Sequence, residues 1–207
     1  MKIRSQNNLS YILFLLTLLS FFLGFFFREN SAGGGTFDSI HEWDYHLLLK
    51  DNILNFLGPD YAASRFPLSL IINIYLNPFI ENQSQFILSF FIYSFILIFL
   101  FYYCLKVSFE YKERNKVLIF TSLLLLSPYF RTSSFWGLQE NLSYIFFIFT
   151  IIFFEVRKKN TYIIMLFSFL TFYTDQKFIF VPGIFFLLLI EKNKFFSKKN
   201  IFLFFYS

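Results

Sequence analysis

The sequence predicts an all-α fold, a polytopic transmembrane helical bundle with amphipathic surface helices in its first outer loop. Hydrophobic residues make up 57% of the 207 residues, against roughly 45 to 50% in ordinary soluble domains. They occur in long runs of Phe, Leu and Ile separated by short polar clusters, the pattern of repeated membrane crossings. The basic residues are also divided unequally between the two sides of these runs. We expect one membrane domain over residues 1–207, truncated at its C-terminal end.

The first predicted span covers residues 9–27 and follows the basic residues Lys2 and Arg4. Its apolar run is long enough to cross a hydrocarbon core of about 30 Å. A cleaved signal peptide is the alternative, because the small residues 31–33 follow the run. An uncleaved anchor is favoured, because the run exceeds the apolar stretch of about 7 to 15 residues in signal peptides.

Five further spans and the start of a seventh follow along the chain. We place the five at 86–105, 117–130, 142–156, 161–173 and 178–190, and the seventh apolar run begins at residue 201. With a cytoplasmic N-terminus, thirteen of the eighteen basic residues lie in cytoplasmic segments, as the positive-inside rule requires. The predicted location is therefore the cell membrane, multi-pass, with the long first loop outside. The short seventh run predicts that the chain is the N-terminal part of a longer protein.

Composition also excludes some classes of function. The net charge of +5 is scattered among the loops rather than gathered in one patch, so we expect no nucleic-acid partner. Cys104 is the single cysteine, which excludes a disulfide framework and a cysteine-based metal site within this chain.

The long first outer loop, residues 28–85, contains both histidines and most of the acidic residues that precede the second span. The three glycines 33–35 release the chain from the first span without restricting φ. An amphipathic helix is predicted over residues 39–57, ended by the Gly58-Pro59 pair, and its apolar side should lie in the membrane interface. A shorter interfacial or packed helix should begin near Pro67 and end before residue 77.

The densest polar cluster of the chain lies at residues 37–46, and two interpretations compete for it. In the first, Ser39 and Glu42 form a capping box and Asp38 is a favourable anion at a helix N-terminus. In the second, Asp38 is a catalytic carboxylate at the membrane surface, where partial desolvation raises its pKa toward that of a general base. The local pattern leaves both open.

The ligand spacing in the same cluster does not favour a metal site built on the two histidines. His41, Asp44 and His46 are separated by three and two residues, which places them on different faces of a helix. Asp38 or Glu42 together with a substrate phosphate is the better arrangement, because Mg²⁺ and Mn²⁺ prefer oxygen ligands. The metal, if one binds, should therefore be Mg or Mn held by these two carboxylates.

The cluster resembles a motif of the GT-C superfamily of membrane glycosyltransferases, which includes protein O-mannosyltransferases and the enzymes that add aminoarabinose to lipid A. Residues 37–41, Phe-Asp-Ser-Ile-His, are similar to the mannosyltransferase motif F-D-E-x-H that follows the first span. Ser39 departs from that motif, which has a second acid there. The order of a first span, a long outer loop with surface helices and many further spans is also similar.

The resemblance implies transfer of a sugar from a polyprenyl-phosphate donor to an acceptor glycan, lipid or protein on the non-cytoplasmic face. It implies Asp38 as the catalytic residue, lipid partners, and substrate-binding roles for a further set of side chains. This set is His41, Glu42, Asp44, Arg65, Arg131, Glu140 and Lys177.

Local alternatives exist for three members of this set. Arg131 would hold the donor phosphate, or it would snorkel at the interface. Glu140 would orient a sugar, or it would cap the helix that begins near residue 141. Lys177 would bind a phosphate oxygen, or it would be a polar residue of a tight turn. A transporter or flippase, and an inactive fragment, are the alternative functions.

Overall fold

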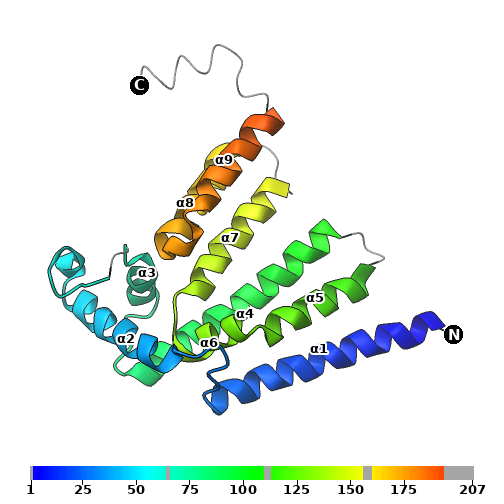
Figure 1. The fold of residues 1–207 in the computed structure, drawn as a ribbon, viewed down its shortest axis with the longest axis horizontal. Coiled ribbons are helices and arrows are strands. Elements are labelled where there is room, and N and C mark those ends of the chain that lie inside the picture. Colours follow the sequence, from blue (N-terminus) through cyan, green and yellow to red (C-terminus); the bar gives the residue numbers. More distant parts are fainter. Residues whose placement is uncertain (1, 64–65, 110–112, 156–159, 194–207) are drawn as a thin grey trace.

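The computed structural model describes residues 2–63, 66–109, 113–155 and 160–193, and every regular element in these ranges is a helix (Figure 1), which confirms the all-α prediction. The first half contains α1 (Lys2–Phe26), α2 (Gly35–Asp51), the 3-10 helix η1 (Ile53–Leu57), α3 (Leu68–Leu76) and α4 (Gln83–Ser108). The second half contains α5 (Arg114–Leu126), α6 (Pro128–Trp136), α7 (Glu140–Glu155), α8 (Thr161–Thr174), the 3-10 helix η3 (Gln176–Phe178) and α9 (Phe180–Asn193).

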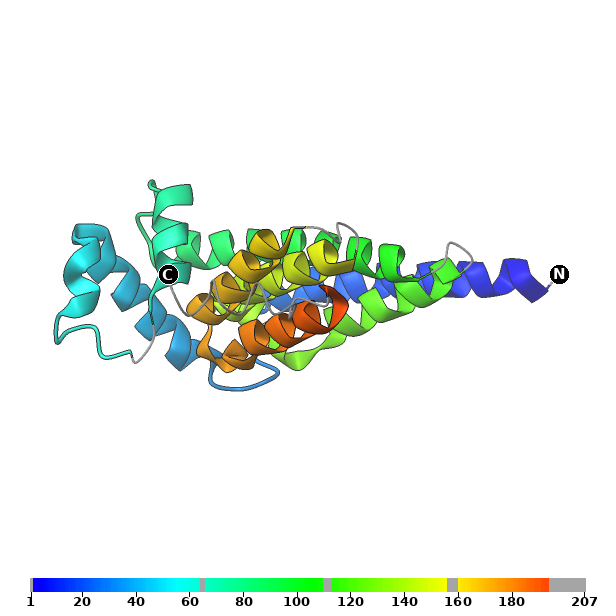
Figure 2. The same ribbon diagram turned by 90° about the horizontal axis from the view of Figure 1, so that it is seen from above.

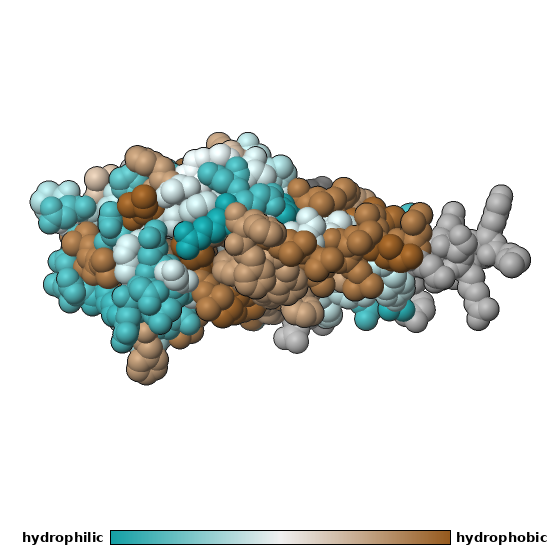
Figure 3. Space-filling view, turned by 90° about the horizontal axis from the view of Figure 1, so that it is seen from below, coloured by the Kyte–Doolittle hydropathy of each residue, from teal (hydrophilic) through white to brown (hydrophobic). Residues whose placement is uncertain are grey.

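The long helices form a fan in which neighbours pack in the order α1, α5, α4, α7, α8, α9 (Figure 1). We call the end that carries α2, α3, α6 and the turn at 175–179 the polar end. Seen from above, α2, η1 and α3 form one extremity of the molecule and the N-terminus lies at the other (Figure 2). Hydrophilic residues gather at the polar end, and hydrophobic residues cover much of the helices beyond it (Figure 3).

The predicted spans match helices, but only some of those helices are long enough to cross a membrane alone. In the described residues, α4 and the Leu9–Phe26 part of α1 are long and apolar enough. Together, α6 and α7 make a third candidate that is bent by 120°. The apolar helices α8 and η3–α9 are shorter. The predicted seventh run at residue 201 lies outside the described residues.

The span predicted at 117–130 is wrong at its C-terminal end, because α5 stops at Leu126. Ser127 caps the next helix by accepting a hydrogen bond from the Phe130 amide, and Pro128 begins that helix. Gly137, at φ 72°, ends it. Part of the predicted second outer loop is therefore helix α6, and residues 130–135 of that helix are all buried.

The capping-box interpretation of Ser39 and Glu42 is wrong, because α2 begins earlier, at Gly35. Gly33 and Gly34 adopt φ of 75° and 72°, a backbone conformation that disfavours other residues and lets the chain turn sharply into α2. Ser39 is buried inside the helix, and its Oγ accepts a hydrogen bond from Gln83 Nε2 at 3.4 Å.

The amphipathic helix predicted over 39–57 is broken at Asn52. The Asn52 side chain accepts a hydrogen bond from the Leu54 amide at 3.0 Å and starts η1. The buried face of α2 is also more polar than predicted, and consists of Gly35, Ser39, Glu42, His46 and Leu49. Leu47, Leu54 and Leu57 remain exposed, whereas Trp43 and Phe56 pack against the core, so only part of the apolar side of α2 and η1 faces away from the bundle.

Aromatic packing fixes α6 against α1 and α4. The Phe21 ring of α1 lies 5.6 Å from Phe91 of α4 and 5.3 Å from Phe130 of α6, and both pairs are stacked. Phe135 of α6 lies 5.0 Å from the same ring. Aromatic pairs of this kind contribute about 0.5 to 1.5 kcal/mol beyond the burial of their area. The short helix α6 is thus stabilised by side-chain packing against α1 and α4.

A buried polar network fastens α3 to α4. The Asn73 Oδ1 atom accepts hydrogen bonds from Ser89 Oγ at 3.0 Å, Tyr93 OH at 2.9 Å and Asn77 Nδ2 at 2.8 Å. Asn73 and Ser89 are buried, and the Asn73 Oδ1 acceptor is satisfied, whereas Asn73 Nδ2 has no hydrogen-bond partner among the described residues.

His46 occupies an apolar site between α2 and α4. It is 1% exposed, neither ring nitrogen has a hydrogen-bond partner, and its ring lies 5.4 Å from Trp43 and 5.0 Å from Phe86. Burial, together with the charge of Lys50, lowers the pKa of His46 to about 4.

Acid is therefore expected to loosen the contact between α2 and α4. Between pH 6.5 and pH 4 the unfolded chain binds a proton that folded His46 rejects, so stability falls as pH falls. At about 1.4 kcal/mol per pKa unit, the loss in free energy of unfolding is about 3 kcal/mol. Thermal unfolding in detergent at pH 7, 5 and 4 measures it. His46→Phe should flatten this profile and His41→Gln should not; equal profiles for both would contradict the assignment.

Candidate functional site

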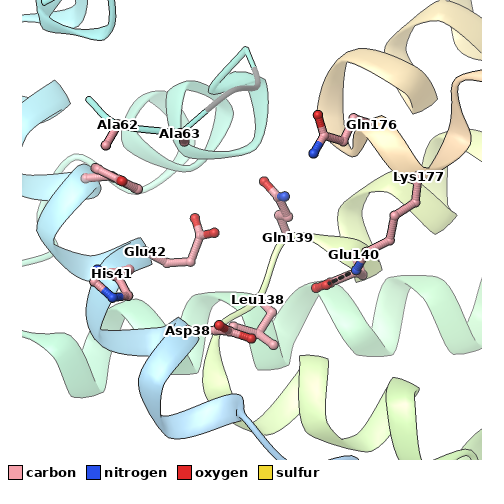
Figure 4. Close-up of a pocket in the computed structure, with 11 residues that line it drawn as sticks. Asp38, His41, Glu42, Ala62, Ala63, Leu138, Gln139, Glu140, Gln176 and Lys177 are labelled. Carbon is pink, nitrogen blue, oxygen red and sulfur yellow. Dashed lines mark hydrogen bonds and ion pairs between the residues drawn. The ribbon is translucent and has the colours of Figure 1, made fainter. Parts of the chain in front are cut away.

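Two adjoining hollows open at the polar end, with volumes of about 400 Å³ and about 320 Å³. We call them the first and the second hollow. Asp38, Leu138, Glu140 and Lys177 line both, so these four residues form their shared boundary. They come from α2, the turn before α7, α7 itself and η3, segments that are far apart in the sequence (Figure 4).

Asp38 lies in the first turn of α2, and its backbone amide donates to Gly34 O at 3.1 Å. A helix N-terminus stabilises the charged carboxylate by roughly 0.3 to 1 kcal/mol at an exposed position. The side chain is exposed, so the desolvation invoked for a general base must come from a bound substrate rather than from the protein.

Glu42 and His41 belong to the same side of α2 as Asp38 and line the first hollow. Glu42 lies one helical turn after Asp38, which places two carboxylates on one face, and Glu42 is 6% exposed. The His41 ring packs edge to face on Phe37 at 4.4 Å. In Figure 4 the carboxylates of Asp38 and Glu42 lie across the hollow from the Glu140–Lys177 pair.

Lys177 is the cation that faces these carboxylates. Its Nζ donates to Glu140 Oε1 at 2.8 Å and lies 4.0 Å from Asp175 Oδ2, while its amide donates to Asp175 Oδ1 at 3.0 Å. Partial burial opposes the charge, but the Glu140 and Asp175 carboxylates outweigh it and raise the pKa of Lys177. The Lys177 side chain is 70% exposed, so its ammonium is accessible to an anionic ligand.

Glu140 is fixed in place by a second partner. Ser133 Oγ of α6 donates to Glu140 Oε2 at 3.0 Å. Glu140 is the first residue of α7, where an acid interacts favourably with the helix dipole, so the capping interpretation and a place in the site both apply to it.

Arg131 does not line either hollow. It is 5% exposed, its Nε donates to Glu29 Oε1 at 2.8 Å, and its Nη2 pairs with Glu29 Oε2. Nη1 and Nη2 also donate to the carbonyls of Leu125 at 3.2 Å and Ser20 at 3.0 Å. The guanidinium therefore joins the ends of α1 and α5 to α6, and its position does not favour the predicted contact with a donor phosphate.

Asp44, a further predicted residue, lies away from the site. Asp44 is exposed and lines neither hollow. It follows Glu42 by two residues, and residues two apart in a helix point to different sides. Arg65 lies outside the described residues.

A full set of protein ligands for a metal is not assembled in the described part of the chain. No three His, Cys, Asp or Glu side chains there come close enough to hold an ion. His46 packs against Trp43 and Phe86, so it does not share a metal site with His41. Asp38 and Glu42 share the first hollow, and Mg²⁺ commonly takes one or two carboxylates together with substrate phosphates and water. A divalent ion would be held there in that way.

Several residues of the site were not predicted from the sequence. Gln139 is 4% exposed, accepts a hydrogen bond from Ser69 Oγ at 3.0 Å and lines the first hollow, as does Gln176. Tyr144 lines the second hollow. Glu29, the partner of Arg131, was also missed, because no local pattern links it to a residue 102 positions away.

Comparison with known protein families, with curated proteins and with solved structures finds no match to this chain. The chemistry of the two hollows is therefore the basis on which a function can be inferred.

Proposed function

We propose that the chain is a multi-pass membrane glycosyltransferase of the GT-C type. It moves a sugar from a polyprenyl-phosphate donor to an acceptor hydroxyl on the non-cytoplasmic face. One observation carries the proposal: the hollows at the polar end bring the Asp38 carboxylate and the exposed Lys177 cation to one site. The likeness of residues 37–41 to the F-D-E-x-H motif supports it independently.

The orientation follows from charge and from the exposed apolar side of α2. The candidate spans are α1, α4 and the bent pair of α6 and α7, and the basic residues Lys106, Arg114 and Lys116, at the end opposite the polar end, are cytoplasmic in this orientation. At the polar end, Leu47, Leu54 and Leu57 dip into the interface beside the spans. The two hollows then lie at the level of the lipid headgroups, where a lipid-linked phosphate is found.

The chemistry is an inverting displacement. The acceptor oxygen forms a bond to the anomeric carbon of the sugar while the bond from that carbon to the phosphate oxygen breaks. Asp38 takes the proton of the acceptor hydroxyl as general base. The electron pair of the broken bond stays on the leaving phosphate, which Lys177 stabilises as a point charge. Glu140 holds the lysine ammonium in the hollow until the phosphate replaces it as partner.

Transport is the weaker alternative. A transporter would place ionisable residues within spans near the middle of the membrane. In the described long helices, acids and bases occur near helix ends. Buried hydroxyls in the interior, such as those of Thr121, Ser122 and Thr150, donate to carbonyls of their own helices. These hydroxyls are satisfied locally and do not form a path for a polar solute.

Removing the charge of Lys177 tests the proposal at the donor. In proteoliposomes supplied with polyprenyl-phosphate sugar, Lys177→Gln should raise the KM for the donor by roughly 10- to 100-fold, the value of a charge-assisted hydrogen bond. Lys177→Arg should recover much of this loss. Arg28→Gln removes an exposed cation outside both hollows and should leave KM unchanged. A wild-type chain that consumes no lipid-linked sugar, or equal KM for all variants, would refute the proposal.

A further inference from the structure

A third hollow, which we call the apolar crevice, lies between α4, α5 and α7. It has a volume of about 350 Å³. The buried side chains of Leu97, Phe130 and Ile148 line it, together with half-buried side chains such as Phe101 and Phe147. Because several of its lining residues are only half-buried, the crevice is open along the surface of the bundle. The proposed reaction at the polar end leaves this crevice without a role.

The apolar crevice meets the second hollow at two aromatic rings. Tyr129, the second residue of α6, and Tyr144, in the second turn of α7, line both spaces. On one side of these rings the lining is almost entirely apolar; on the other side lie Asp38, Glu140 and Lys177. Tyr129 is 78% exposed, so its ring can move without disturbing the core. The two spaces together form one amphipathic path from α4 to the polar end.

We propose that the apolar crevice binds the hydrocarbon chain of a polyprenyl phosphate, with the phosphate in the second hollow beside Lys177. The inference rests on the proposed function for the identity of the lipid. Two observations argue for this occupant: the crevice continues into the second hollow, and the exposed ammonium of Lys177 complements an anionic head at that junction. The volume of about 350 Å³ is also within the range of ligand pockets, roughly 300 to 1,000 Å³.

The contact between α4 and its neighbours explains why the crevice exists. The helix α4 packs against α5 on one side and against α7 on the other. The chain leaves α5 through α6, which is bent by 120° relative to α7. Because α6 does not continue between the long helices, a space lined by residues of α4, α5 and α7 remains in the described part of the chain. A lipid chain can enter it from the side of the fan.

Cys104 provides a built-in probe, because it lines the apolar crevice and is the single cysteine of the chain. In proteoliposomes, sugar-free polyprenyl phosphate should slow the alkylation of Cys104 by a maleimide at least about tenfold. Inorganic phosphate should not slow it, and polyprenol without the phosphate should protect much less. Equal rates with and without polyprenyl phosphate would overturn the proposal.

Two adjacent leucines of α5 give a matched pair of variants. Leu124 lines the apolar crevice, whereas Leu123 is 56% exposed and lies outside it. Filling the crevice with Leu124→Trp should reduce crosslinking by a diazirine-bearing polyprenyl phosphate roughly tenfold, because a few methylene contacts are lost. Leu123→Trp should crosslink like the wild type. Ile151→Trp, on the α7 wall, repeats the test if Leu124→Trp does not fold.

Peptide mapping of the crosslinks decides the location. Adducts on the α4 and α7 residues of the crevice support the proposal, and adducts spread over the exposed face of α1 overturn it. The measurement is lipid binding and needs no sugar. A chain that binds polyprenyl phosphate in the crevice but transfers no sugar therefore contradicts the glycosyltransferase proposal and leaves the lipid site standing.

Discussion

Replacing Asp38 by Asn is expected to reduce the rate of sugar transfer by about 10²- to 10⁴-fold, the contribution of a positioned general base. Asn keeps the size of the side chain and its place in the first turn of α2, but it cannot accept the proton of the acceptor hydroxyl. The rate constant kcat should fall while the KM for the donor changes little, because Asp38 acts on the acceptor. The measurement is consumption of a labelled polyprenyl-phosphate sugar at saturating donor.

Asp44→Asn is the matched control. Asp44 carries the same charge on the same helix, is exposed and lines neither hollow. Its replacement should leave kcat within about twofold of the wild type, since surface changes of this kind usually cost less than 0.5 kcal/mol. Wild-type turnover by a correctly inserted Asp38→Asn protein would eliminate Asp38 as the base. An equal loss in both variants would point to a general effect of charge instead.

The second large effect is expected at the ion pair of Arg131 and Glu29. Glu29→Gln should lower the free energy of unfolding by about 3 kcal/mol, because the guanidinium is 94% buried and would lose its counter-charge. In a chain of this length, such a loss lowers Tm by roughly 6 to 12 °C. Circular dichroism at 222 nm during heating in detergent measures it. Glu29 is a third exposed, which places the estimate at the low end of the usual range.

The acid dependence of the same pair has a fixed sign. The bond from Arg131 lowers the pKa of Glu29 below 4.5, although partial burial opposes this. The pair therefore stabilises the fold fully above pH 4.5, and this stabilisation is lost as pH falls through the lowered pKa. Glu29→Gln should lack this part of the acid transition.

A compensated variant separates the pair from the packing around it. Replacing both Arg131 and Glu29 by Met should recover much of the lost stability, since an apolar pair of similar size often replaces a buried ion pair at little cost. Gly24→Ala should be destabilising, because its Cβ would lie 2.5 Å from Arg131 Nη2 and 2.6 Å from Glu29 Oε2. A Glu29→Gln protein as stable as the wild type would exclude a structural role for the pair.

The sequence predicted the helices best where apolar runs are long. The helices α4, α7 and α8 begin and end close to the predicted spans, and α1 ends close to its span but begins earlier, at Lys2. Long apolar runs have few other ways to be buried. Helix α6 was missed because four consecutive polar residues, 131–134, interrupt its apolar residues, although Ser127, Pro128 and Gly137 are ordinary boundary signals. The break at Asn52 was missed because the apolar pattern continues across it.

The site was predicted residue by residue but not as an arrangement. The local cluster at 37–46 identified Asp38. This residue lines both hollows, which agrees with a catalytic role, and that role stays a prediction. The convergence of Asp38 with Lys177 depends on the packing of α7 and α8, which no local pattern contains. The partner of Arg131 is Glu29, which lies 102 residues earlier in the chain. The sequence around Arg131 does not show this pairing, and so a contact with a donor phosphate was predicted instead.

The place of Lys177 in the chain has a consequence for biogenesis. Translation delivers Asp38 first, Glu140 about a hundred residues later and Lys177 last, after α8. The boundary between the two hollows is therefore incomplete until α8 has packed on α7 and brought η3 beside it. A nascent chain that exposes only its first loop lacks Lys177, the cation that we propose binds the lipid phosphate. In the proposed enzyme, the order of synthesis thus delays reactivity until α8 and η3 are in place.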